Sequence, residues 1–430
     1  MTRKPMHLSS AAIDGHSQGL CQELRPGADR TGMLAVVADP SCFSLPYDYS
    51  LCHALHAAGC GVMLARSNYL YDQWEPARTF ASWNGFYEVT HGLGRKHSRR
   101  WVWKLAKGAE HVFSMKHFGR ELRNLKPDVI HFQWLPVPVL DRLFLPSLAR
   151  IAPLVLTLHD TNFSRSGLMV RWQQETGIRS VFKHLSALIV HSKFSKQRVL
   201  ENRWMPQEKV YVVPHGPLEY YHAVKSQPAP LVSSEPVILF FGRIEHSKGV
   251  DFLLRAFAAL PPGIMSQTRL VIAGKPGRTI ESLRMLSTKL GIDHRVTWDL
   301  RFVAEKEVPS LFQSASVIVL PYREIDQSGV LMTAIAFGKP IIATRVGGIP
   351  ETVQDRVHGF LVRPGDIPQL TQALHDILGD PERKAGMEKA VQRLRTGSLS
   401  WTSSAEKTLE IYRRLAYGDS RSAIAETLSA

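Results

Sequence analysis

The sequence predicts two α/β domains, each built around a doubly wound parallel sheet. With 430 residues, the chain is too long for one ordinary hydrophobic core. Short apolar runs alternate with helical patterns, which is typical of parallel strands joined by helices. The segment Pro214–Pro236 interrupts this alternation with prolines and a serine pair, so one series of strands lies on each side of it.

The first series opens with a continuous apolar run, Met33–Ala38, as expected for a parallel strand buried on both faces. A helix is predicted next, over Tyr49–Ala58. The further strands predicted in this series are Gly61–Leu64, Val129–Trp134, Leu154–Leu158, Ala187–Val190 and Val210–Val213. The alternation places residues 31–222 in one domain, after a loose tail over 1–30 and before a linker over 223–236.

The second series predicts a second domain over residues 237–398. Its predicted strands are Val237–Phe241, Arg269–Ala273, Val296–Trp298, Val317–Leu320, Ile341–Ala343 and Gly359–Val362. Helices are predicted over Ile367–Leu378, Arg383–Leu394 and Trp401–Leu415, with a tail over 418–430. Ligands of open α/β sheets bind at the carboxyl ends of the strands, so site residues are expected there.

Composition limits the class of protein. Apolar residues make up 44% and charged residues 21%, as in soluble globular proteins, and no run of 18 apolar residues predicts a membrane span. The polar first 30 residues contain no apolar signal core, and four scattered cysteines form no Cys-x-x-Cys pair or zinc pattern. We therefore expect a cytoplasmic protein with reduced thiols and no metal. The net charge of +15 favours an anionic partner: a nucleotide, a nucleic acid or a membrane surface.

The segment after strand Val237–Phe241 is suited to binding a diphosphate. It contains a Gly242-Arg243 turn and a Lys248-Gly249 pair before an amphipathic helix. Arginine offers a planar fork of donors to phosphate oxygens, and lysine offers a mobile point charge. Glycine lets backbone N–H groups approach the anion closely.

Two later turns extend this candidate site. Gln327-Ser328-Gly329 precedes the helical run Val330–Phe337, so it predicts an anion site at a helix N-terminus, an ordinary Ser328 N-cap, or both. Gly347-Gly348 and Glu351 form a loop after strand Ile341–Ala343. Glu351 is either a ligand-binding residue or a first-turn acid that complements a helix dipole.

These motifs, in this order, resemble the donor-binding half of the retaining GT-B glycosyltransferases of family 4. The resemblance extends over about residues 31–417 and is strongest over 237–351. It implies two Rossmann-like domains facing across a cleft, with residues 399–417 returning to the first domain as a helix. It also implies that Arg243 and Lys248 contact the diphosphate of a nucleotide sugar, and that Gln327–Gly329 contact the distal phosphate or the donor sugar.

The sequence departs from this family at one point. Many members carry a pair of glutamates that contact the donor sugar and the ribose, and the corresponding positions here are Ile325 and Thr333. Neither side chain is a carboxylate, although Glu324 and Asp326 flank the first position and the Thr333 hydroxyl is able to bond a ribose. Some members share the Gln-Ser-Gly turn without the glutamate pair, so the departure does not imply loss of activity.

The first domain is expected to supply the acceptor side. His159-Asp160 ends the strand Leu154–Leu158, where a histidine beside an acid either polarises a hydroxyl nucleophile or is a structural residue bonded to a carbonyl. Trp134 either stacks on a sugar ring or belongs to the core. His215 is a further candidate, although a hinge role suits it better, and Arg301 either reaches the site or is an ordinary surface residue.

A basic segment, 94–126, predicts a membrane-binding helix. Its ten basic residues are opposed by only Glu110 and Glu121 and are interleaved with apolar side chains. Such a helix suits an anionic membrane surface, or it packs its apolar stripe on the first domain. Nucleic-acid binding has the same electrostatics, but no recognisable motif accompanies it, so we expect no nucleic acid partner.

The resemblance implies a metal-independent hexosyltransferase without a cofactor. The nucleotide-diphosphate sugar is its substrate, and the acceptor is the hydroxyl of a lipid-linked or polysaccharide glycan at the inner face of the cell membrane. In the front-face route ascribed to this family, the departing diphosphate helps to deprotonate the acceptor hydroxyl. Two alternatives remain open: a non-catalytic subunit that binds nucleotide sugars, and a GT-B epimerase that changes a nucleotide sugar without an acceptor.

Overall fold

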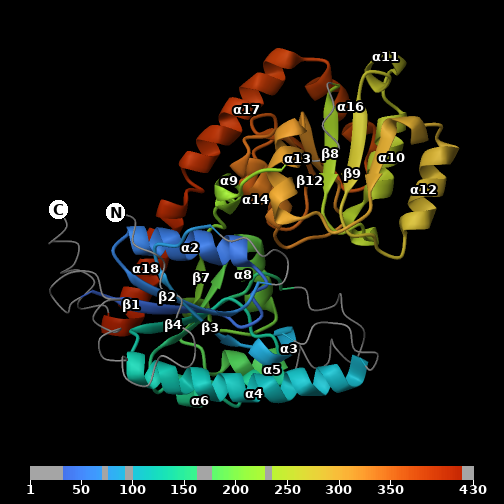
Figure 1. The fold of residues 1–430 in the computed structure, drawn as a ribbon. Coiled ribbons are helices and arrows are strands. Elements are labelled where there is room, and N and C mark those ends of the chain that lie inside the picture. The colour runs from blue at the N-terminus through green and yellow to red at the C-terminus, as the bar shows by residue number, and fades with distance from the viewer. Residues whose placement is uncertain (1–31, 70–75, 93–99, 162–176, 228–234, 419–430) are drawn as a thin grey trace. The chain divides into compact units, whose positions relative to one another are not determined.

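The computed structural model describes residues 32–69, 76–92, 100–161, 177–227 and 235–418 (Figure 1). Several predictions lie outside these ranges: the tails before residue 32 and after 418, part of the linker, and the basic residues Arg95, Lys96 and Arg99. The described residues pack into two compact units. The first unit runs to His191 and includes Lys196–Pro214 and the segment from Trp401 onward; the second combines Ser192–Ser195 with His215–Ser400.

The first unit contains a parallel 7-stranded sheet in the order β3-β2-β1-β4-β5-β6-β7. Its strands are β1 (Leu34–Asp39), β2 (Gly61–Ser67), β3 (Ala81–Phe86), β4 (Val129–Phe132), β5 (Leu154–Thr157), β6 (Ala187–Val190) and β7 (Val210–Val212). Every residue of β1 is buried, because strands pair on both sides of it and its two faces are covered. The predicted apolar runs of this domain are confirmed as strands.

One strand of this sheet was not predicted. Strand β3 carries Ser82, Asn84 and Gly85 among its apolar residues, so it lacks the continuous apolar pattern of the other strands. It pairs only with β2 at the edge of the sheet, where partial exposure tolerates polar side chains.

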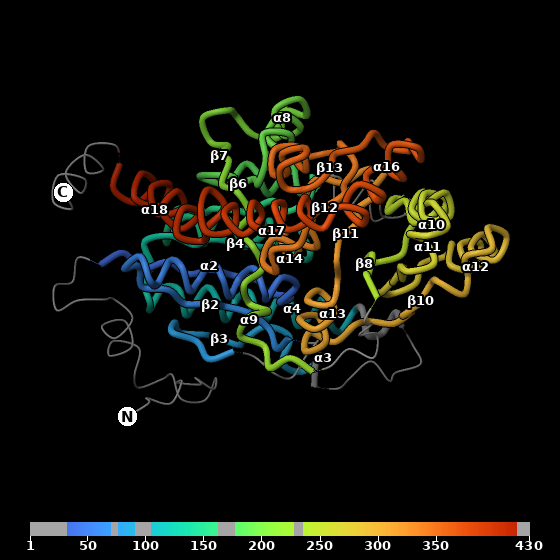
Figure 2. Tube along the Cα trace, turned by 90° about the horizontal axis from the view of Figure 1, so that it is seen from above, coloured from blue at the N-terminus to red at the C-terminus, as the bar shows by residue number. Residues whose placement is uncertain are grey.

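Helices accompany the first sheet. They are α2 (Leu45–Ala57), α3 (Glu88–Gly92), α4 (Arg100–Leu125), α5 (Pro138–Asp141), α6 (Leu145–Leu148), α8 (Lys193–Glu201) and α18 (Trp401–Tyr417), with a 3₁₀ turn at Gln207–Lys209. Helix α18, from the end of the described chain, lies beside α2 (Figure 2). Helix α2 begins four residues before its prediction because Pro46 occupies a first-turn position that suits proline.

The second unit contains a parallel 6-stranded sheet in the order β10-β9-β8-β11-β12-β13. Its strands are β8 (Val237–Phe241), β9 (Arg269–Ala273), β10 (Val296–Asp299), β11 (Val317–Leu320), β12 (Ile341–Thr344) and β13 (Gly359–Val362). All six match predicted strands to within a residue. The prediction of two doubly wound α/β domains is therefore confirmed.

The helices of the second unit follow its strands in the usual alternation. They are α9 (Tyr220–Ala223), α10 (Val250–Ala258), α11 (Pro262–Met265), α12 (Ile280–Lys289), α13 (Val308–Ser314), α14 (Gly329–Ala336), α15 (Ile349–Thr352), α16 (Ile367–Leu378) and α17 (Pro381–Thr396), with 3₁₀ turns at His246–Lys248, Asp293–Arg295 and Glu305–Glu307. Helices α16 and α17 begin with aspartate caps, in which the carboxylates of Asp366 and Asp380 accept backbone N–H groups.

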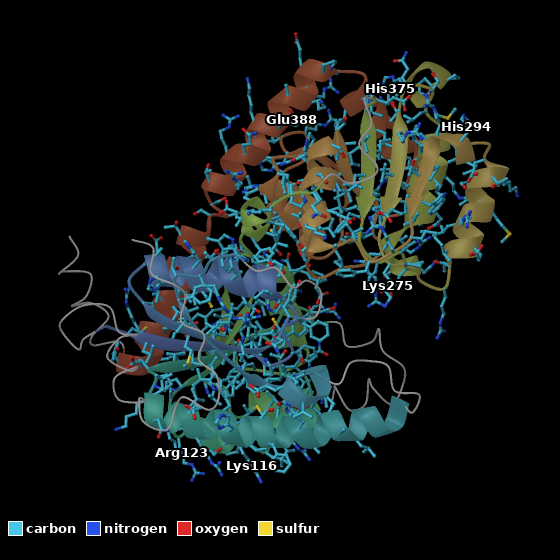
Figure 3. The ribbon with its side chains drawn as sticks, viewed as in Figure 1. Lys116, Arg123, Lys275, His294, His375 and Glu388 are labelled. Atoms are coloured by element: carbon cyan, nitrogen blue, oxygen red, sulfur yellow. The ribbon has the colours of Figure 1, made fainter. Side chains whose placement is uncertain are left out.

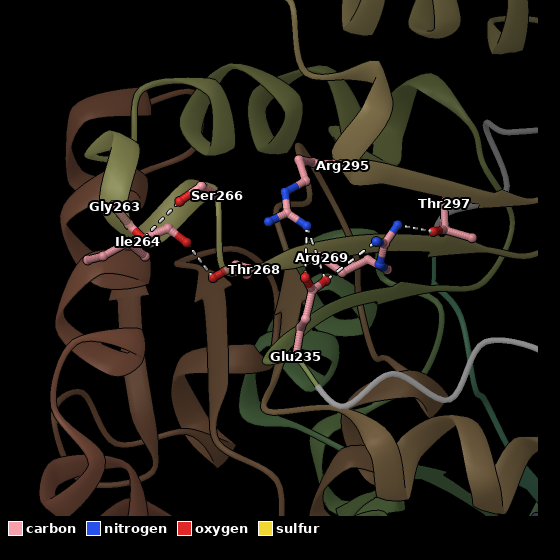
Figure 4. A network of polar contacts seen from close by, with 8 residues as sticks. All are labelled: Glu235, Gly263, Ile264, Ser266, Thr268, Arg269, Arg295 and Thr297. Carbon is pink, nitrogen blue, oxygen red and sulfur yellow. Dashed lines mark hydrogen bonds and ion pairs between the residues drawn. The ribbon is translucent and has the colours of Figure 1, made fainter.

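A polar network joins three strands of this sheet where they begin (Figure 4). The carboxylate of Glu235, just before β8, accepts hydrogen bonds of 3.0 and 3.2 Å from Arg295, just before β10. Arg269, at the start of β9, lies 3.4 Å from the same carboxylate. The Arg295 guanidinium lowers the pKa of Glu235. Internal ion pairs thus occupy the side of the sheet where the strands begin. The predicted site lies on the opposite side, where the strands end.

Candidate active site

The predicted donor-binding residues gather where the strands of the second sheet end. Strands β9, β8, β11 and β12 are neighbours in the sheet, and the loops that follow them carry Gly274-Lys275, Gly242–Gly249, Pro321–Gly329 and Arg345–Gly348. Figure 3 labels Lys275 at this edge. Backbone bonds tie these loops together, because Ile244 N–H donates to the Lys275 carbonyl and Arg323 N–H donates to the Ser247 carbonyl.

Gly249 is required by the geometry of the loop after β8. Its φ is +65°, and a Cβ atom there would lie 1.9 Å from the Pro321 carbonyl oxygen. Only glycine combines a left-handed conformation with so close an approach. The turn His246–Lys248 is thereby pressed against the loop that follows β11.

The two predicted phosphate-binding cations differ in their surroundings. The Lys248 Nζ lies 4.1 Å from the centre of the Tyr322 ring, so its ammonium group is positioned by a cation–π contact. The Arg243 side chain is 73% exposed, and its guanidinium lies 2.6 Å from the Glu245 carboxylate. Arg243 is therefore exposed and paired with an acid, whereas the Lys248 ammonium group lies against an aromatic ring.

The same two loops are clamped by Arg323. Its guanidinium donates to both carboxylate oxygens of Asp251 at 2.9 and 2.7 Å, and to the His246 carbonyl at 2.7 Å. A planar bidentate pair of this kind fixes orientation as well as distance. The clamp holds the start of α10 and the turn carrying Lys248 to the loop after β11.

Helix α14 begins at the same edge with the predicted Gln327-Ser328-Gly329 turn. The Ser328 hydroxyl accepts the Leu331 N–H at 3.2 Å, which confirms its N-cap role, and it lies 3.4 Å from the Tyr322 hydroxyl. Burial raises the pKa of Tyr322 to about 12, so this hydroxyl keeps its proton. Gly329 is exposed, and the first-turn N–H groups of a helix favour an anion.

The Gly347-Gly348 loop packs against the segment that leads into α14. Gly347 has a φ of +55°, and a Cβ atom there would lie 1.8 Å from the Ile325 carbonyl oxygen. The Gly348 N–H donates to the Asp326 carbonyl at 3.0 Å. The loop therefore supports the backbone of Ile325–Gln327 from the side of β12.

In the first unit, His159 follows strand β5 and is half-buried. The Trp134 ring stacks on it, with centroids 5.1 Å apart and planes 17° apart. Tyr47 meets it edge-on at 4.8 Å. These rings fix the plane of the imidazole, and both alternatives for Trp134, sugar stacking and a place in the core, stay predictions.

Both ring nitrogens of His159 have neighbours within the first unit. Its Nδ1 lies 3.2 Å from the Nε2 of His191, and its Nε2 lies 3.2 Å from the Oε1 of Gln133. The Nδ1 of His191 lies 2.9 Å from the Val213 carbonyl oxygen. His191 was not among the predicted site residues, and only its place after strand β6 indicates a role.

The chain of polar contacts continues inward from Gln133. Its Nε2 lies 3.3 Å from the Nε2 of His131, which also lies 2.7 Å from the Thr157 hydroxyl. The Nδ1 of His131 lies 2.6 Å from the Tyr412 hydroxyl on α18. A continuous buried network thus joins the end of β5 to the helix that completes the first unit.

Sequence comparisons identify both units. Residues 47–216 match the family described as Glycosyltransferase Family 4, and residues 235–380 match Glycosyl transferases group 1. The chain belongs to the GT-B glycosyltransferases. A D-inositol 3-phosphate glycosyltransferase of Mycobacterium avium is 34% identical over 184 residues, which are 42% of this chain and 42% of that relative, so the match covers less than half of the relative's length.

Solved structures of GT-B glycosyltransferases share the fold. Sucrose-phosphate synthase from Thermosynechococcus elongatus matches with a TM-score of 0.65 and 20% identity, over 89% of this chain and 99% of that chain. Anabaena HepE in complex with UDP and glucose matches with a TM-score of 0.61 and 17% identity, over 88% and 98% of the two chains. At these identities the likeness concerns the fold.

The two positions where many GT-B glycosyltransferases carry glutamate are buried in this one. Ile325 is 8% exposed, and Thr333 is 3% exposed with its hydroxyl donating to the Gly329 carbonyl at 2.9 Å. Of the flanking acids, Glu324 is exposed and Asp326 is buried. Roles for Thr333, Glu324 and Asp326 in binding the donor stay predictions.

The remaining predicted residues of this glycosyltransferase have contacts of their own within each unit. The Glu351 carboxylate accepts hydrogen bonds from the N–H groups of Lys193 and Phe194. Both residues belong, like Glu351, to the second unit. Arg301 pairs with Asp299 and Glu307, as a surface arginine does. His215 is buried with its Nδ1 2.6 Å from the Gly216 carbonyl oxygen, and Asp160 is half-buried beside His159.

Burial of the histidine network predicts a loss of stability in acid. Burial lowers the pKa of His131 from 6.5 to about 3, so the unfolded chain binds a proton at a higher pH than the folded chain. The stability that neutral His131 contributes is complete above pH 6.5 and is lost as the pH falls from 6.5 towards 3. At pH 5, protonation of this one group in the unfolded chain lowers the free energy of unfolding by about 2 kcal/mol relative to pH 7.5.

The variant His131→Gln, which removes the titrating group, is therefore expected to reduce the fall in free energy of unfolding between pH 7.5 and pH 5 by about 2 kcal/mol. Urea unfolding at the two pH values measures it. His53→Gln, at an exposed position of α2, is the matched control and is expected to keep the wild-type difference. An unchanged pH dependence in His131→Gln would contradict the assignment.

Proposed function

We propose that this GT-B glycosyltransferase transfers a hexosyl group from a nucleotide-diphosphate sugar to an acceptor hydroxyl, with retention at the anomeric carbon. The observation that supports the proposal is the placement of Arg243 and Lys248 in the loop after β8, where Lys248 lies over the Tyr322 ring and the Tyr322 hydroxyl lies 3.4 Å from Ser328, the cap of α14. The solved complex of HepE with UDP and glucose, which shares the fold, supports a donor of this class.

In this reaction the bond between the anomeric carbon and the diphosphate oxygen breaks, and the acceptor oxygen bonds to the same face of that carbon. The acceptor proton passes to the departing diphosphate. The leaving group gains negative charge, and in this proposal Arg243, Lys248 and the N–H groups at the start of α14 stabilise it. The proposal requires no metal ion and no enzymic nucleophile.

We place the acceptor side in the first unit, around His159, and propose a lipid-linked or polysaccharide glycan as the acceptor. The face of α4 supports docking to an anionic membrane. Phe113 and Leu105 are 72% and 66% exposed there, and Lys116 and Arg123 extend from the same helix (Figure 3). Buried Phe118 and Leu122 pack the opposite stripe onto the sheet, so the predicted packing role and the membrane role use different faces.

A basic pocket adjoins this face. It has a volume of about 430 Å³ and is lined by Arg123, Lys126, Arg150, Ser147 and Ile151, which suits the phosphate of a lipid headgroup. Among the described residues, no helix is both long enough and apolar enough to cross a membrane.

Sedimentation of the protein with vesicles is expected to show a clear preference for anionic over neutral lipid. Binding to anionic vesicles is expected to weaken roughly 30-fold in Lys116→Ala/Arg123→Ala, because each cation near the surface contributes about 1 kcal/mol. The matched control is Arg284→Ala/Lys289→Ala, which removes the same charge from exposed positions of α12. Equal binding to neutral and anionic vesicles would contradict membrane docking through this face.

A second candidate is a non-catalytic subunit that binds nucleotide sugars, and the buried Ile325 and Thr333 at the glutamate positions favour it. A panel of nucleotide sugars separates the two. A ligand that binds the folded state stabilises it by mass action. One donor that raises the melting temperature and releases nucleoside diphosphate, with membrane extract as acceptor, supports the transferase. Stabilisation without release supports the subunit, and no stabilisation by any donor overturns both.

A further inference from the structure

The contacts of His191 determine where the proton of His159 lies. The Nδ1 of His191 lies 2.9 Å from the Val213 carbonyl oxygen, which only accepts hydrogen bonds. The Nδ1 of His191 therefore carries a proton and donates it. Because burial of His191 lowers its pKa to about 4, the ring is neutral near pH 7 and its Nε2 holds a lone pair.

That lone pair faces His159. The Nε2 of His191 lies 3.2 Å from the Nδ1 of His159, so a hydrogen bond between them requires the proton to be on the Nδ1 of His159. In the neutral form of His159, the Nε2 is then the accepting nitrogen. The hydrogen bonds that run from Val213 through His191 to His159 thus fix the tautomer of neutral His159, because each donor must face an acceptor.

Gln133 is able to follow either protonation state of His159. Its terminal amide lies 3.2 Å from the Nε2 of His159 and 3.3 Å from the Nε2 of His131. The amide oxygen facing His159 matches a protonated Nε2, whereas the amide nitrogen facing it matches a neutral ring. His131 accommodates both arrangements, because its other contacts are hydroxyl groups that either donate or accept.

We propose that His191 is a positioning residue that holds the proton of His159 on Nδ1, so that Nε2 is the nitrogen that accepts a hydrogen bond from a sugar hydroxyl. A bound hydroxyl then replaces the Gln133 amide as the partner of Nε2. The stacked Trp134 and edge-on Tyr47 keep the ring plane constant during this exchange. The catalytic consequence rests on the proposed function, whereas the tautomer is a property of the free protein.

Two variants of His191 separate the tautomer from simple packing. His191→Gln retains a donor for the Val213 carbonyl and an acceptor for His159, because one amide group provides both. His191→Phe retains a ring of similar size but offers no acceptor. The proton of His159 is then expected to move to Nε2, where the Gln133 oxygen accepts it.

The test is long-range ¹H–¹⁵N correlation of the imidazole rings in the full chain at pH 7.5, assigned with His159→Gln. The expected result is a proton on Nδ1 of His159 in wild type and His191→Gln, and on Nε2 in His191→Phe. With the donor from the panel, kcat/KM is expected to fall about 10²-fold in His191→Phe and to recover most of this in His191→Gln.

A proton on Nε2 of neutral His159 in the wild type overturns the proposal. Equal kcat/KM in all three proteins, with the tautomer moved in His191→Phe, also overturns it, because the tautomer would then be irrelevant to the reaction. The spectra report the tautomer without substrate, so they decide the position of the proton by themselves. A failure of every donor to react counts against the proposed function only.

Discussion

Replacing Arg243 and Lys248 together by alanine is expected to lower kcat/KM for the donor by roughly 10³-fold, because each cation stabilises the charge of the departing diphosphate. Stability is expected to change little. Arg243 is 73% exposed, and the contact of Lys248 with Tyr322 is worth about 0.5–1 kcal/mol. Steady-state release of nucleoside diphosphate and a thermal melt of the same preparation measure the two effects.

The control for this double variant is Arg284→Ala/Lys289→Ala, which makes the same change in net charge on α12, and kcat/KM is expected to stay within twofold of wild type. Arg243→Lys adds a second comparison, since it keeps the charge and loses the planar fork, and partial recovery is expected. An equal loss of activity in both double variants would show that overall charge, and not the turn after β8, attracts the donor.

The way in which the loss of activity divides between kcat and KM shows whether each cation acts on the bound donor or on the transition state. A fall in kcat indicates contacts made only in the transition state, whereas a rise in KM alone indicates contacts made equally in the bound donor. Lys248 is held over Tyr322 before any ligand binds, so its variant is expected to lower kcat. The exposed Arg243 is expected to contribute more to KM.

The fold was predictable because buried parallel strands leave a strong pattern. Leu34–Asp39 and Val317–Leu320 are buried throughout, and short apolar runs that alternate with helical patterns are typical of buried parallel strands. The edge strand Ala81–Phe86 was not predictable, since it pairs on one side only and includes Asn84 and Gly85. Patterns of apolar residues report burial, and an edge strand is only partly buried.

The candidate site was predictable where a short motif carries its own chemistry. Arg243, Lys248 and the Ser328 cap follow strands or open helices, so their sequence neighbours alone place them at the carboxyl edge of the sheet. His191 was missed because its role depends on partners from two other loops. A histidine after a strand is common, and only the order of β5, β6 and β7 brings its two neighbours within reach.

The contact between Gly249 and Pro321 was likewise not predictable from the sequence, because it joins distant parts of the chain. Gly249→Ala is expected to lower the free energy of unfolding by about 3 kcal/mol, combining the cost of a left-handed alanine with that of an overpacked contact. It is also expected to displace the turn His246–Lys248, and with it the ammonium group of Lys248, so that affinity for nucleoside diphosphate falls at least 10-fold. Urea unfolding and calorimetric titration measure the two quantities.

Gly291→Ala provides the matched control. Gly291 has a φ of +70°, close to the +65° of Gly249, but a Cβ atom there would meet nothing within 4 Å. Gly291→Ala is therefore expected to lower the free energy of unfolding by about 1 kcal/mol, the cost of a left-handed alanine alone. The affinity for nucleoside diphosphate is expected to stay unchanged. Equal costs for the two variants would mean that the Pro321 carbonyl moves aside freely. The turn carrying Lys248 would then be held by the Arg323–Asp251 clamp, and Arg323→Ala, not Gly249→Ala, would be the change that releases it.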